Sequence, residues 1–131
     1  MAERRQNFST GSHFERTYGY SRAVRVGDTI HVAGTVGLDY DTGRIPEDPV
    51  DQFHQIVRNI SRALDMAGGR LEDVVEIVLY MTGSEVMEAI GPALAETFGK
   101  IGPTNTALVV AFPFPDIKLE IKSVAIVGCG G

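Results

Sequence analysis

The sequence predicts an α+β fold in which one mixed six-stranded sheet carries two helices on one face. Three observations lead to this prediction. Strand pairs joined by turns lie at both ends of the chain, two helical stripes alternate with strands in the middle, and a length of 131 residues suits a single domain.

The composition divides the chain into a leader, one domain and a tail. Residues 1–12 are polar and contain Ser and Gly, which is typical of a flexible leader. The single domain is expected at residues 13–128, and Cys-Gly-Gly at residues 129–131 forms a short tail.

A hairpin opens the domain at residues 20–34, YSRAVRVGDTIHVAG. Valines alternate with arginines on its first strand, Gly27 and Asp28 supply the turn, and Ile30 and Val32 alternate on the return strand.

The clearest helix is predicted over residues 49–67. Asp48 is placed to cap its N-terminus ahead of Pro49, and a Gly-Gly pair ends it. Turn-forming residues at 38–48 separate it from the hairpin. Its apolar residues recur at helical spacing: Phe53, Ile56, Val57, Ile60, Leu64 and Ala67.

A strand is predicted at residues 74–81, apolar on both faces apart from Glu76, as expected for a covered central strand. A second helix follows, and Gly91-Pro92 inside it is expected to weaken or kink it. The stripe of this helix consists of Val86, Ile90, Leu94 and Phe98.

Two strands end the chain, at residues 106–112 and 118–127, joined by the turn sequence PFPD. The element order is therefore β-β-(β)-α-β-α-β-β, in which an optional third strand before the first helix would complete the six.

The composition excludes several classes of protein. The net charge is −5 and no basic run exceeds Arg4-Arg5, so a nucleic-acid partner is not expected. No apolar run reaches about 18 residues, so no membrane span is expected. The single cysteine, Cys129, allows no internal disulfide, and no signal peptide is visible, which together favour a cytoplasmic location.

The predicted sheet has one face that its own helices leave open. Residues on the last strand alternate, with Glu120, Lys122, Val124 and Ile126 facing away from Leu119, Ile121, Ser123 and Ala125. The stretch ALVVAFPF is apolar on both sides. An apolar patch of this kind usually marks an interface, so a homo-oligomer is expected; the alternative is that loops cover the face.

Few residues are suited to chemistry. His13, His31 and His54 lack metal-ligand spacing, so no metal site is expected, and they are interpreted as ordinary structural or surface residues. No phosphate loop and no nucleophile elbow is present, and Cys129 has no base near it in the sequence.

Three polar residues at strand ends remain, Tyr20, Asn105 and Glu120. Glu120 is either a solvated strand residue or a carboxylate at a subunit boundary, where partial burial would raise its pKa and let it relay a proton. Asn105 either provides polarity at a strand entrance or lines a site.

The chain resembles the Rid family, also called YjgF or L-PSP proteins, over residues 20–127. The segments that carry the resemblance are GYSRAVRVGDTIHVAGT, DYDTGRIPED, QIVRNISRALDMAGGRLEDVVEIVLYMT and GPTNTALVVAFPFPDIKLEIKSVAIV. The resemblance implies a chorismate-mutase-like fold and a homotrimer with clefts between its subunits. It also implies hydrolysis of reactive enamines and imines, such as 2-aminoacrylate, without a cofactor.

The sequence departs from the deaminating members at the residue that grips the substrate carboxylate. Those members carry Pro-x-Arg where this chain has Pro103-Thr104-Asn105, so the forked cationic contact is missing. The family's tyrosine and glutamate are retained as Tyr20 and Glu120. Other positions that the resemblance places in the substrate cleft are Ala33, Gly34, Thr35, Ala107, Phe14 and Arg22.

Two functions remain open at this point. In the first, Glu120 and Tyr20 are catalytic, Asn105 holds a carbonyl or amide oxygen, and the substrate is a small enamine, imine or carbonyl metabolite. In the second, the protein is a trimer that binds a metabolite or acts as a chaperone without catalysis. RNA cleavage follows only from an older label of the family, and no basic or paired-histidine feature of the sequence favours it.

Overall fold

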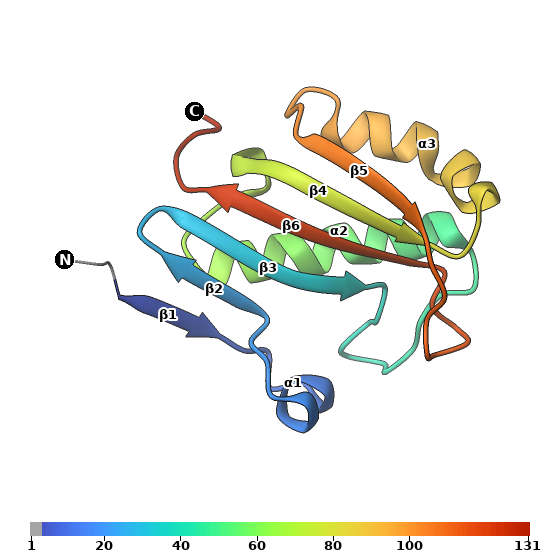
Figure 1. The fold of residues 1–131 in the computed structure, drawn as a ribbon, viewed down its shortest axis with the longest axis horizontal. Helices are drawn as coiled ribbons and strands as arrows, with labels where there is room; N and C mark the ends of the chain where they lie inside the picture. The colour runs from blue at the N-terminus through green and yellow to red at the C-terminus, as the bar shows by residue number, and fades with distance from the viewer. Residues whose placement is uncertain (1–3) are drawn as a thin grey trace.

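The computed structural model describes residues 4–131 and contains a six-stranded sheet with the order β1-β2-β3-β6-β4-β5 (Figure 1). Neighbouring strands are antiparallel except β4 and β5, which are parallel, so the sheet is mixed as predicted. The strands are β1 (Arg5–Phe8), β2 (Ala23–Val26), β3 (Thr29–Val36), β4 (Val74–Met81), β5 (Thr104–Val109) and β6 (Leu119–Ile126).

Two long helices, α2 (Pro49–Met66) and α3 (Ser84–Phe98), lie on the same side of the sheet, behind it in the view of Figure 1. The α2 helix begins as predicted, with the Asp48 side chain accepting a hydrogen bond from the Val50 N–H. A short 3-10 helix, η1 (Leu71–Asp73), precedes β4, and a short helix, α1 (His13–Tyr18), follows β1.

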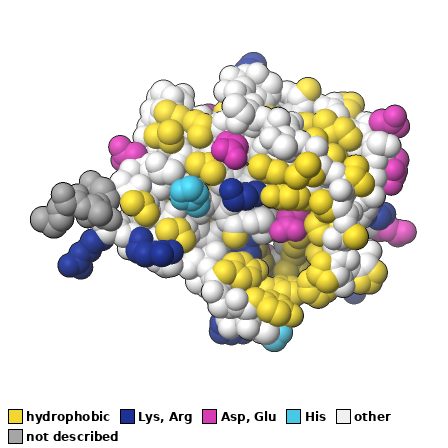
Figure 2. Space-filling model, viewed as in Figure 1, with side chains coloured by type: hydrophobic (Ala, Val, Ile, Leu, Met, Phe, Trp, Pro, Cys, Tyr) yellow, Lys and Arg dark blue, Asp and Glu magenta, His cyan; other side chains and the backbone are white. Residues whose placement is uncertain are grey.

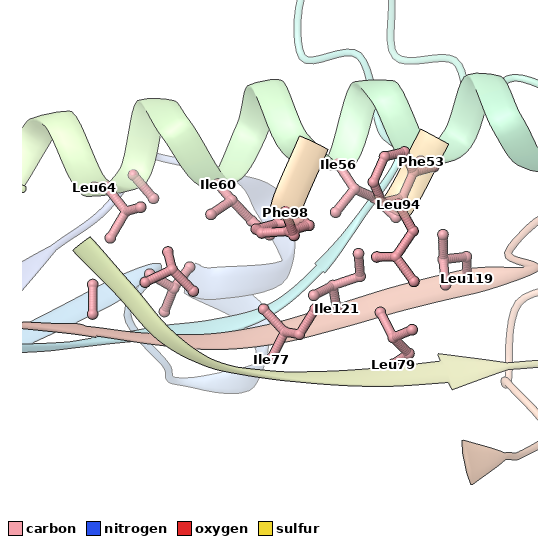
Figure 3. Close-up of a cluster of buried hydrophobic side chains, with 14 of the residues drawn as sticks. Phe53, Ile56, Ile60, Leu64, Ile77, Leu79, Leu94, Phe98, Leu119 and Ile121 are labelled. Atoms are coloured by element: carbon pink, nitrogen blue, oxygen red, sulfur yellow. The ribbon is translucent and has the colours of Figure 1, made fainter. Parts of the chain in front are cut away.

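The hydrophobic core fills the space between the two long helices and the sheet (Figure 3). Each large aliphatic or aromatic side chain buried there contributes about 1.5–3 kcal/mol relative to an exposed one. The predicted helical stripes and the predicted inward set of β6 face the core, and all but the partly buried Val57 are buried, including Phe53, Ile60, Leu94, Phe98, Leu119 and Ile121.

The structure differs from the predicted flexible leader at residues 1–12 in that residues 5–8 form a strand. Arg5–Phe8 form β1, which pairs antiparallel with β2, and Phe8 packs against the core. The polar sequence RQNF gives no hydrophobic alternation, so its strand character comes from the unpaired backbone edge that β2 offers. Residues 1–3 lie outside the described residues.

Other boundaries differ from the sequence prediction in detail. The sixth strand is β1 rather than a strand after the hairpin, and β5 begins at Thr104 rather than at residue 106. The α3 helix continues through Pro92 to Phe98, because packing of its buried stripe outweighs the hydrogen bond that Pro92 cannot donate.

The tail at residues 129–131 packs against η1. The Gly130 N–H donates to the Asp73 carboxylate at 3.0 Å, and the Cys129 thiol donates to the Asp73 carbonyl at 3.4 Å. Burial raises the pKa of Asp73, but backbone N–H groups of Gly130, Gly128 and Arg70 outweigh this and hold it below its ordinary value.

The sheet face opposite α2 and α3 is covered by neither long helix and carries scattered apolar side chains (Figures 1 and 2). Every residue of the edge strand β5 is exposed, Val109 by 65%. Large apolar side chains that remain exposed along the sheet include Val26, Leu108, Val109 and Ile126. No helix within residues 4–131 combines the length and the apolar character needed to span a bilayer.

Candidate functional site

An apolar hollow of about 340 Å³ lies where α1, the ends of β3 and β6, and the segment 112–117 meet (Figure 2). We call it the Glu120 hollow. Its size falls at the lower end of the range of small-molecule sites. Most of its lining is apolar, and its polar side chains include Tyr20, Arg22, Tyr40 and Glu120.

Glu120 projects from β6 toward the face that the helices leave open, opposite Val36 of β3 and Tyr80 of β4. Its carboxylate lies directly over Gly34, whose missing side chain makes room for it. Burial raises the pKa of Glu120, and the charge of Arg22 opposes this only in part. Glu120 therefore changes between its protonated and ionised forms at a higher pH than an ordinary glutamate does.

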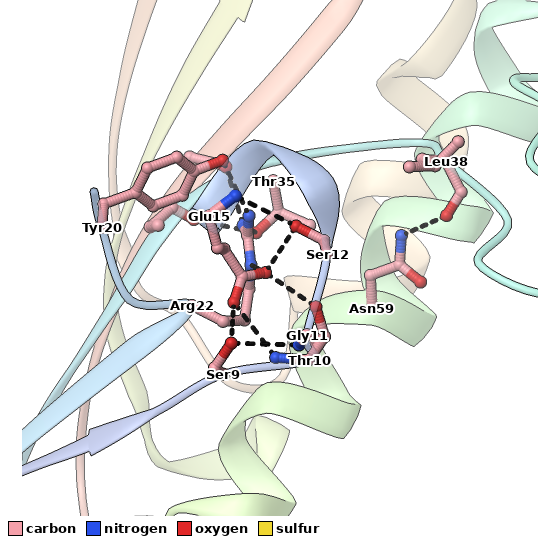
Figure 4. Close-up of polar contacts among 12 residues, drawn as sticks. Ser9, Thr10, Gly11, Ser12, Glu15, Tyr20, Arg22, Thr35, Leu38 and Asn59 are labelled. Carbon is pink, nitrogen blue, oxygen red and sulfur yellow. Dashed lines mark hydrogen bonds and ion pairs between the residues drawn. The ribbon is translucent and has the colours of Figure 1, made fainter. Parts of the chain in front are cut away.

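Arg22 lies at the back of the hollow, 5% exposed, and its guanidinium is held from several sides (Figure 4). Its Nη1 donates to the Gly34 carbonyl at 2.9 Å and to the Thr35 hydroxyl at 3.3 Å. Its Nη2 donates to the Tyr20 hydroxyl at 3.4 Å, and its Nε donates to the Glu15 carboxylate at 3.4 Å. The arginine thus ties Tyr20 to the backbone beneath Glu120.

Glu15, from α1, is the buried partner of Arg22 and is only 3% exposed. The hydroxyls of Ser9, Thr10 and Ser12 donate to its carboxylate at 2.7, 2.7 and 3.0 Å, and the Thr10 N–H donates at 3.1 Å. Burial raises the pKa of Glu15, but these hydrogen bonds outweigh it and hold the pKa below its ordinary value. Glu15 is therefore an ionised carboxylate at neutral pH.

Two tyrosines face the hollow with different surroundings. Tyr20 is 40% exposed, and the Arg22 guanidinium lies 5.6 Å from its ring centre. Burial raises the pKa of Tyr40, with a further increase from Glu15 and Tyr20 and a decrease from Arg22. Tyr40 thus keeps its proton and offers a neutral hydroxyl.

Aromatic rings form the outer wall. Phe14 of α1 contacts Phe114 edge-to-face at 5.3 Å, so α1 and the segment 112–117 meet across the mouth of the hollow. Phe14 also stacks on Tyr18 one helical turn further on, at 6.3 Å. Neither ring belongs to the hydrophobic core cluster between the helices and the sheet.

Two buried amides of α2 fix the loops around the hollow. Gln52 Nε2 donates to the carbonyls of Pro46 and Asp116 at 2.8 and 2.9 Å, and its Oε1 accepts the Lys118 N–H at 3.1 Å. Asn59 Nδ2 donates to the carbonyls of Val36 and Leu38 at 3.1 and 2.8 Å (Figure 4). Both sides of the hollow are therefore anchored to the same helix.

The structure brings some of the predicted site residues together in one chain. Those that line the Glu120 hollow are Phe14, Tyr20, Arg22, Gly34 and Glu120. Thr35 is 1% exposed and its hydroxyl donates to the Ala33 carbonyl, so it supports Arg22 instead of presenting a surface to a ligand. Ala33 lines a more open depression beside Tyr20.

Asn105 and Ala107 do not line the hollow of their own chain. They lie on β5 in register with Ile77 and Leu79, so they share the sheet face of the core, whereas Glu120 is on the opposite face. Strand β4 also separates them from β6. Any site that joins Asn105 to Glu120 needs a second copy of the chain.

Sequence reasoning missed three contributors to the site. The α1 helix was not predicted, although Ser12 and Glu15 have the spacing of a helix-capping pair and Ser12 does accept the Glu15 N–H. Tyr40 and Phe114 lie in segments that read as turns, and only the folded chain turns them toward Glu120.

The arrangement is suited to proton transfer in an apolar setting. A carboxyl group with a raised pKa can donate a proton when neutral and accept one when ionised. The hydroxyls of Tyr20 and Tyr40 can orient a polar substrate atom beside it. Within residues 4–131, no three His, Cys, Asp or Glu side chains are grouped so as to hold a metal ion.

Comparison with known proteins places this chain among small proteins of the same fold. The family profile described as Endoribonuclease L-PSP matches residues 10–127. A RutC family protein of Pyrococcus horikoshii is 31% identical over 107 residues, which cover 81% of this chain and 85% of that protein. The 2-iminobutanoate/2-iminopropanoate deaminase of Mus musculus is 28% identical over 110 residues, covering 83% and 82%.

A solved structure agrees with these sequence matches. A member of the YjgF/YER057c/UK114 family from Mycobacterium tuberculosis superposes with a TM-score of 0.85 at 38% identity, covering 95% of this chain and all of that one. The predicted six-stranded YjgF-type fold with two main helices is thereby confirmed. The chain belongs to the endoribonuclease L-PSP family, whose members are also called RutC, YjgF or Rid proteins.

Proposed function

We propose that this protein acts on a small enamine, imine or related carbonyl metabolite at the Glu120 hollow, in a homotrimer whose subunit boundaries complete the site. The observation that carries the proposal is a carboxyl group of raised pKa, Glu120, in an apolar hollow beside two tyrosine hydroxyls. Deaminases of 2-iminobutanoate and 2-iminopropanoate among the relatives favour imine chemistry for this family member as well.

In the proposed reaction, protonated Glu120 donates its proton to the carbon of an enamine, which gives the imine or iminium form. The ionised carboxylate then accepts a proton from water as the water oxygen bonds to the C=N carbon. Glu120 then returns this proton to the nitrogen as the C–N bond breaks and accepts the proton of the new hydroxyl as the C=O bond forms, so that ammonia or an amine leaves, the carbonyl product remains and Glu120 is protonated again. Tyr20, held by Arg22, orients the substrate during these steps.

The proposed trimer follows from the positions of the candidate residues. Asn105 and Glu120 lie on opposite faces of one sheet, so only a neighbouring chain can bring Asn105 to a Glu120 hollow. The fully exposed edge strand β5 and the half-exposed apolar face supply a surface for that contact. Light scattering should give three times the 14.2 kDa chain mass at micromolar concentration; a stable monomer would remove the shared site.

We further propose that the protein is not a standard deaminase of 2-aminoacrylate, because Asn105 replaces the arginine that would grip a carboxylate. The loss of a charged bidentate contact weakens binding by about 2–5 kcal/mol. The wild type should therefore release ammonia from freshly generated 2-aminoacrylate slowly, and Asn105→Arg should release it faster. A wild-type rate equal to that of a competent deaminase would contradict this assignment.

Catalysis by Glu120 is tested with Glu120→Gln, which keeps the shape of the side chain and removes its titration. Turnover of a neutral enamine should fall at least about a hundredfold, within the range of general acid–base catalysis. Glu96→Gln, on the exposed face of α3, is the matched control for the change in charge. Undiminished turnover in Glu120→Gln would exclude Glu120 from the mechanism.

A second candidate function is metabolite binding without catalysis. It is favoured by the fact that the site lacks the usual arginine at residue 105, while Arg22 is engaged within the protein. Tight retention of a metabolite by the purified protein, together with no acceleration across a set of enamines and imines, would support this function over the enzymatic one.

A further inference from the structure

We infer that Glu15 is a specificity-determining residue: by neutralising Arg22 it makes the Glu120 hollow select uncharged ligands and reject carboxylates. This inference rests on the proposed function in that it concerns the same hollow, but it does not depend on catalysis. It assigns the ligand a chemical class, namely a compact apolar molecule that carries a neutral N–H or O–H group.

The side chains around the hollow carry more acidic than basic groups. Of the described residues that line it, Arg22 alone is cationic, whereas Asp116 and Glu120 are acidic. A carboxylate ligand would therefore depend on Arg22 for its counter-charge, and it would enter a site that already contains acidic side chains.

The guanidinium of Arg22 has little hydrogen-bonding capacity left for a ligand. Its contacts to Glu15, Gly34, Thr35 and Tyr20 use all but one of its N–H groups. Among the described residues, Arg22 forms its ion pair with Glu15 and none with Glu120. The raised pKa of Glu120 agrees with this, because a cation free to pair with Glu120 would lower that pKa.

The carboxylate of Glu15 is held in place by its own hydrogen bonds. Four hydrogen bonds from Ser9, Thr10 and Ser12 hold its carboxylate in place, so it cannot rotate away when a competing anion arrives. Both members of the pair are more than nine-tenths buried, so solvent and salt screen their interaction weakly. An entering carboxylate would therefore have to compete with a buried carboxylate that its own hydrogen bonds hold beside Arg22.

The walls indicate the rest of the ligand. Phe14 and Phe114 present aromatic surfaces on the outer side, and Val36 and Leu38 present aliphatic ones. Glu120, when ionised, accepts a hydrogen bond from an N–H or O–H group placed between these surfaces. An enamine, an amide or an aromatic amine meets these requirements, and none of them carries a negative charge.

The test compares benzamide with benzoate, which have nearly the same shape and differ in charge. Binding to the wild type and to Glu15→Gln is measured by titration with NMR detection at neutral pH, with Glu96→Gln as the charge control. The wild type and Glu96→Gln should bind benzamide at least about tenfold more tightly than benzoate. In Glu15→Gln, Arg22 loses its counter-charge, so benzoate should gain about tenfold or more.

A double variant, Glu15→Gln with Arg22→Gln, should lose the gain in benzoate affinity, which would show that the gain comes from Arg22. The inference is overturned if the wild type prefers benzoate, if neither probe binds it, or if folded Glu15→Gln shows no gain. If Glu15→Gln does not fold, two other measurements test the inference: the preference of the wild type for benzamide over benzoate, and the benzoate affinity of Arg22→Gln. An Arg22→Gln variant that binds benzoate more weakly than the wild type would show that Arg22 already binds anions, and it would overturn the inference. Loss of enamine turnover alone would concern the proposed catalysis and leave this selectivity intact.

Discussion

The carboxylate of Glu120 occupies the space in which a side chain on Gly34 would begin. A Cβ atom on Gly34 would lie 2.0 Å from Glu120 Oε1 and 2.9 Å from its Cδ. Gly34 of β3 thus leaves the space that the Glu120 side chain of β6 fills, and the absence of a side chain at residue 34 sets the position of the carboxylate.

Gly34→Ala should therefore displace the Glu120 carboxylate while leaving the fold in place, because the colliding atoms belong to the end of a flexible side chain. A misplacement of about 1 Å can lower turnover by roughly a hundredfold. The measurements are turnover of a neutral enamine and the free energy of unfolding.

The matched control for this variant is Gly91→Ala. A Cβ at Gly91, inside α3, would meet no atom within 4 Å, so this change should stabilise the protein by up to about 1 kcal/mol through helix propensity. Full activity in Gly34→Ala would show that the contact does not position Glu120 for the reaction.

The raised pKa of Glu120 predicts a particular pH dependence of stability. Because the folded state favours the protonated carboxyl, the stability that this preference contributes is complete below the ordinary glutamate pKa and is lost as pH rises through the folded pKa. Glu120→Gln has no such loss. The free energy of unfolding of Glu120→Gln, relative to that of the wild type, should therefore increase as pH rises from the unfolded to the folded pKa of Glu120 and then level off, as measured by urea denaturation across that range; a constant difference would contradict the raised pKa.

The repeating parts of the fold were predictable from the sequence because burial imposes a period on them. The stripe of α2 and the alternation of β6 both appear in the sequence and both face the core. Strand β1 has no such period, since its residues are mostly exposed and it forms by pairing with the edge of β2. Its existence depends on a tertiary partner that no local pattern reveals.

The candidate site was predictable only in part for the same reason. Tyr20 and Glu120 were singled out as polar residues at strand ends, the family resemblance supplied their proposed roles, and the structure places both at one hollow. The ion pair between Glu15 and Arg22 joins a residue of α1 to one just ahead of β2, seven positions further on, and its importance depends on the burial of both. The spacing of Ser12 and Glu15 could have indicated the helix start that was missed, but it carries no sign of the buried charge pair.

Ser123 provides a prediction about stability. Its Oγ is buried within the described part of the chain and has no hydrogen-bond partner there. An unpaired buried hydroxyl is unfavourable by about 1–3 kcal/mol, so Ser123→Ala should be neutral or stabilising by about 1 kcal/mol in chemical denaturation. A clear loss of stability would mean that the hydroxyl is satisfied by a group such as a buried water.

Asp73 provides a prediction about the tail. Asp73→Asn removes the charge that accepts N–H groups from Arg70 and Gly130, and it should destabilise the fold by about 1–3 kcal/mol. Because the folded pKa is lowered, the contribution of the wild-type carboxylate is present above its unfolded pKa and is lost as pH falls through the folded pKa. The difference between the variants should therefore shrink in acid. The exposed neighbour Glu72→Gln is the control and should change stability little.

The three hydrogen bonds of Gln52 have a consequence for how this protein can diversify. One amide joins the segments around Pro46 and Asp116, which are 70 residues apart in the sequence, to the helix that forms the centre of the core. Moving these segments apart would leave buried polar groups unpaired, so substitutions on the outer rim, such as at Phe14 and Phe114, should change ligand preference at a lower cost in stability than a wider opening would.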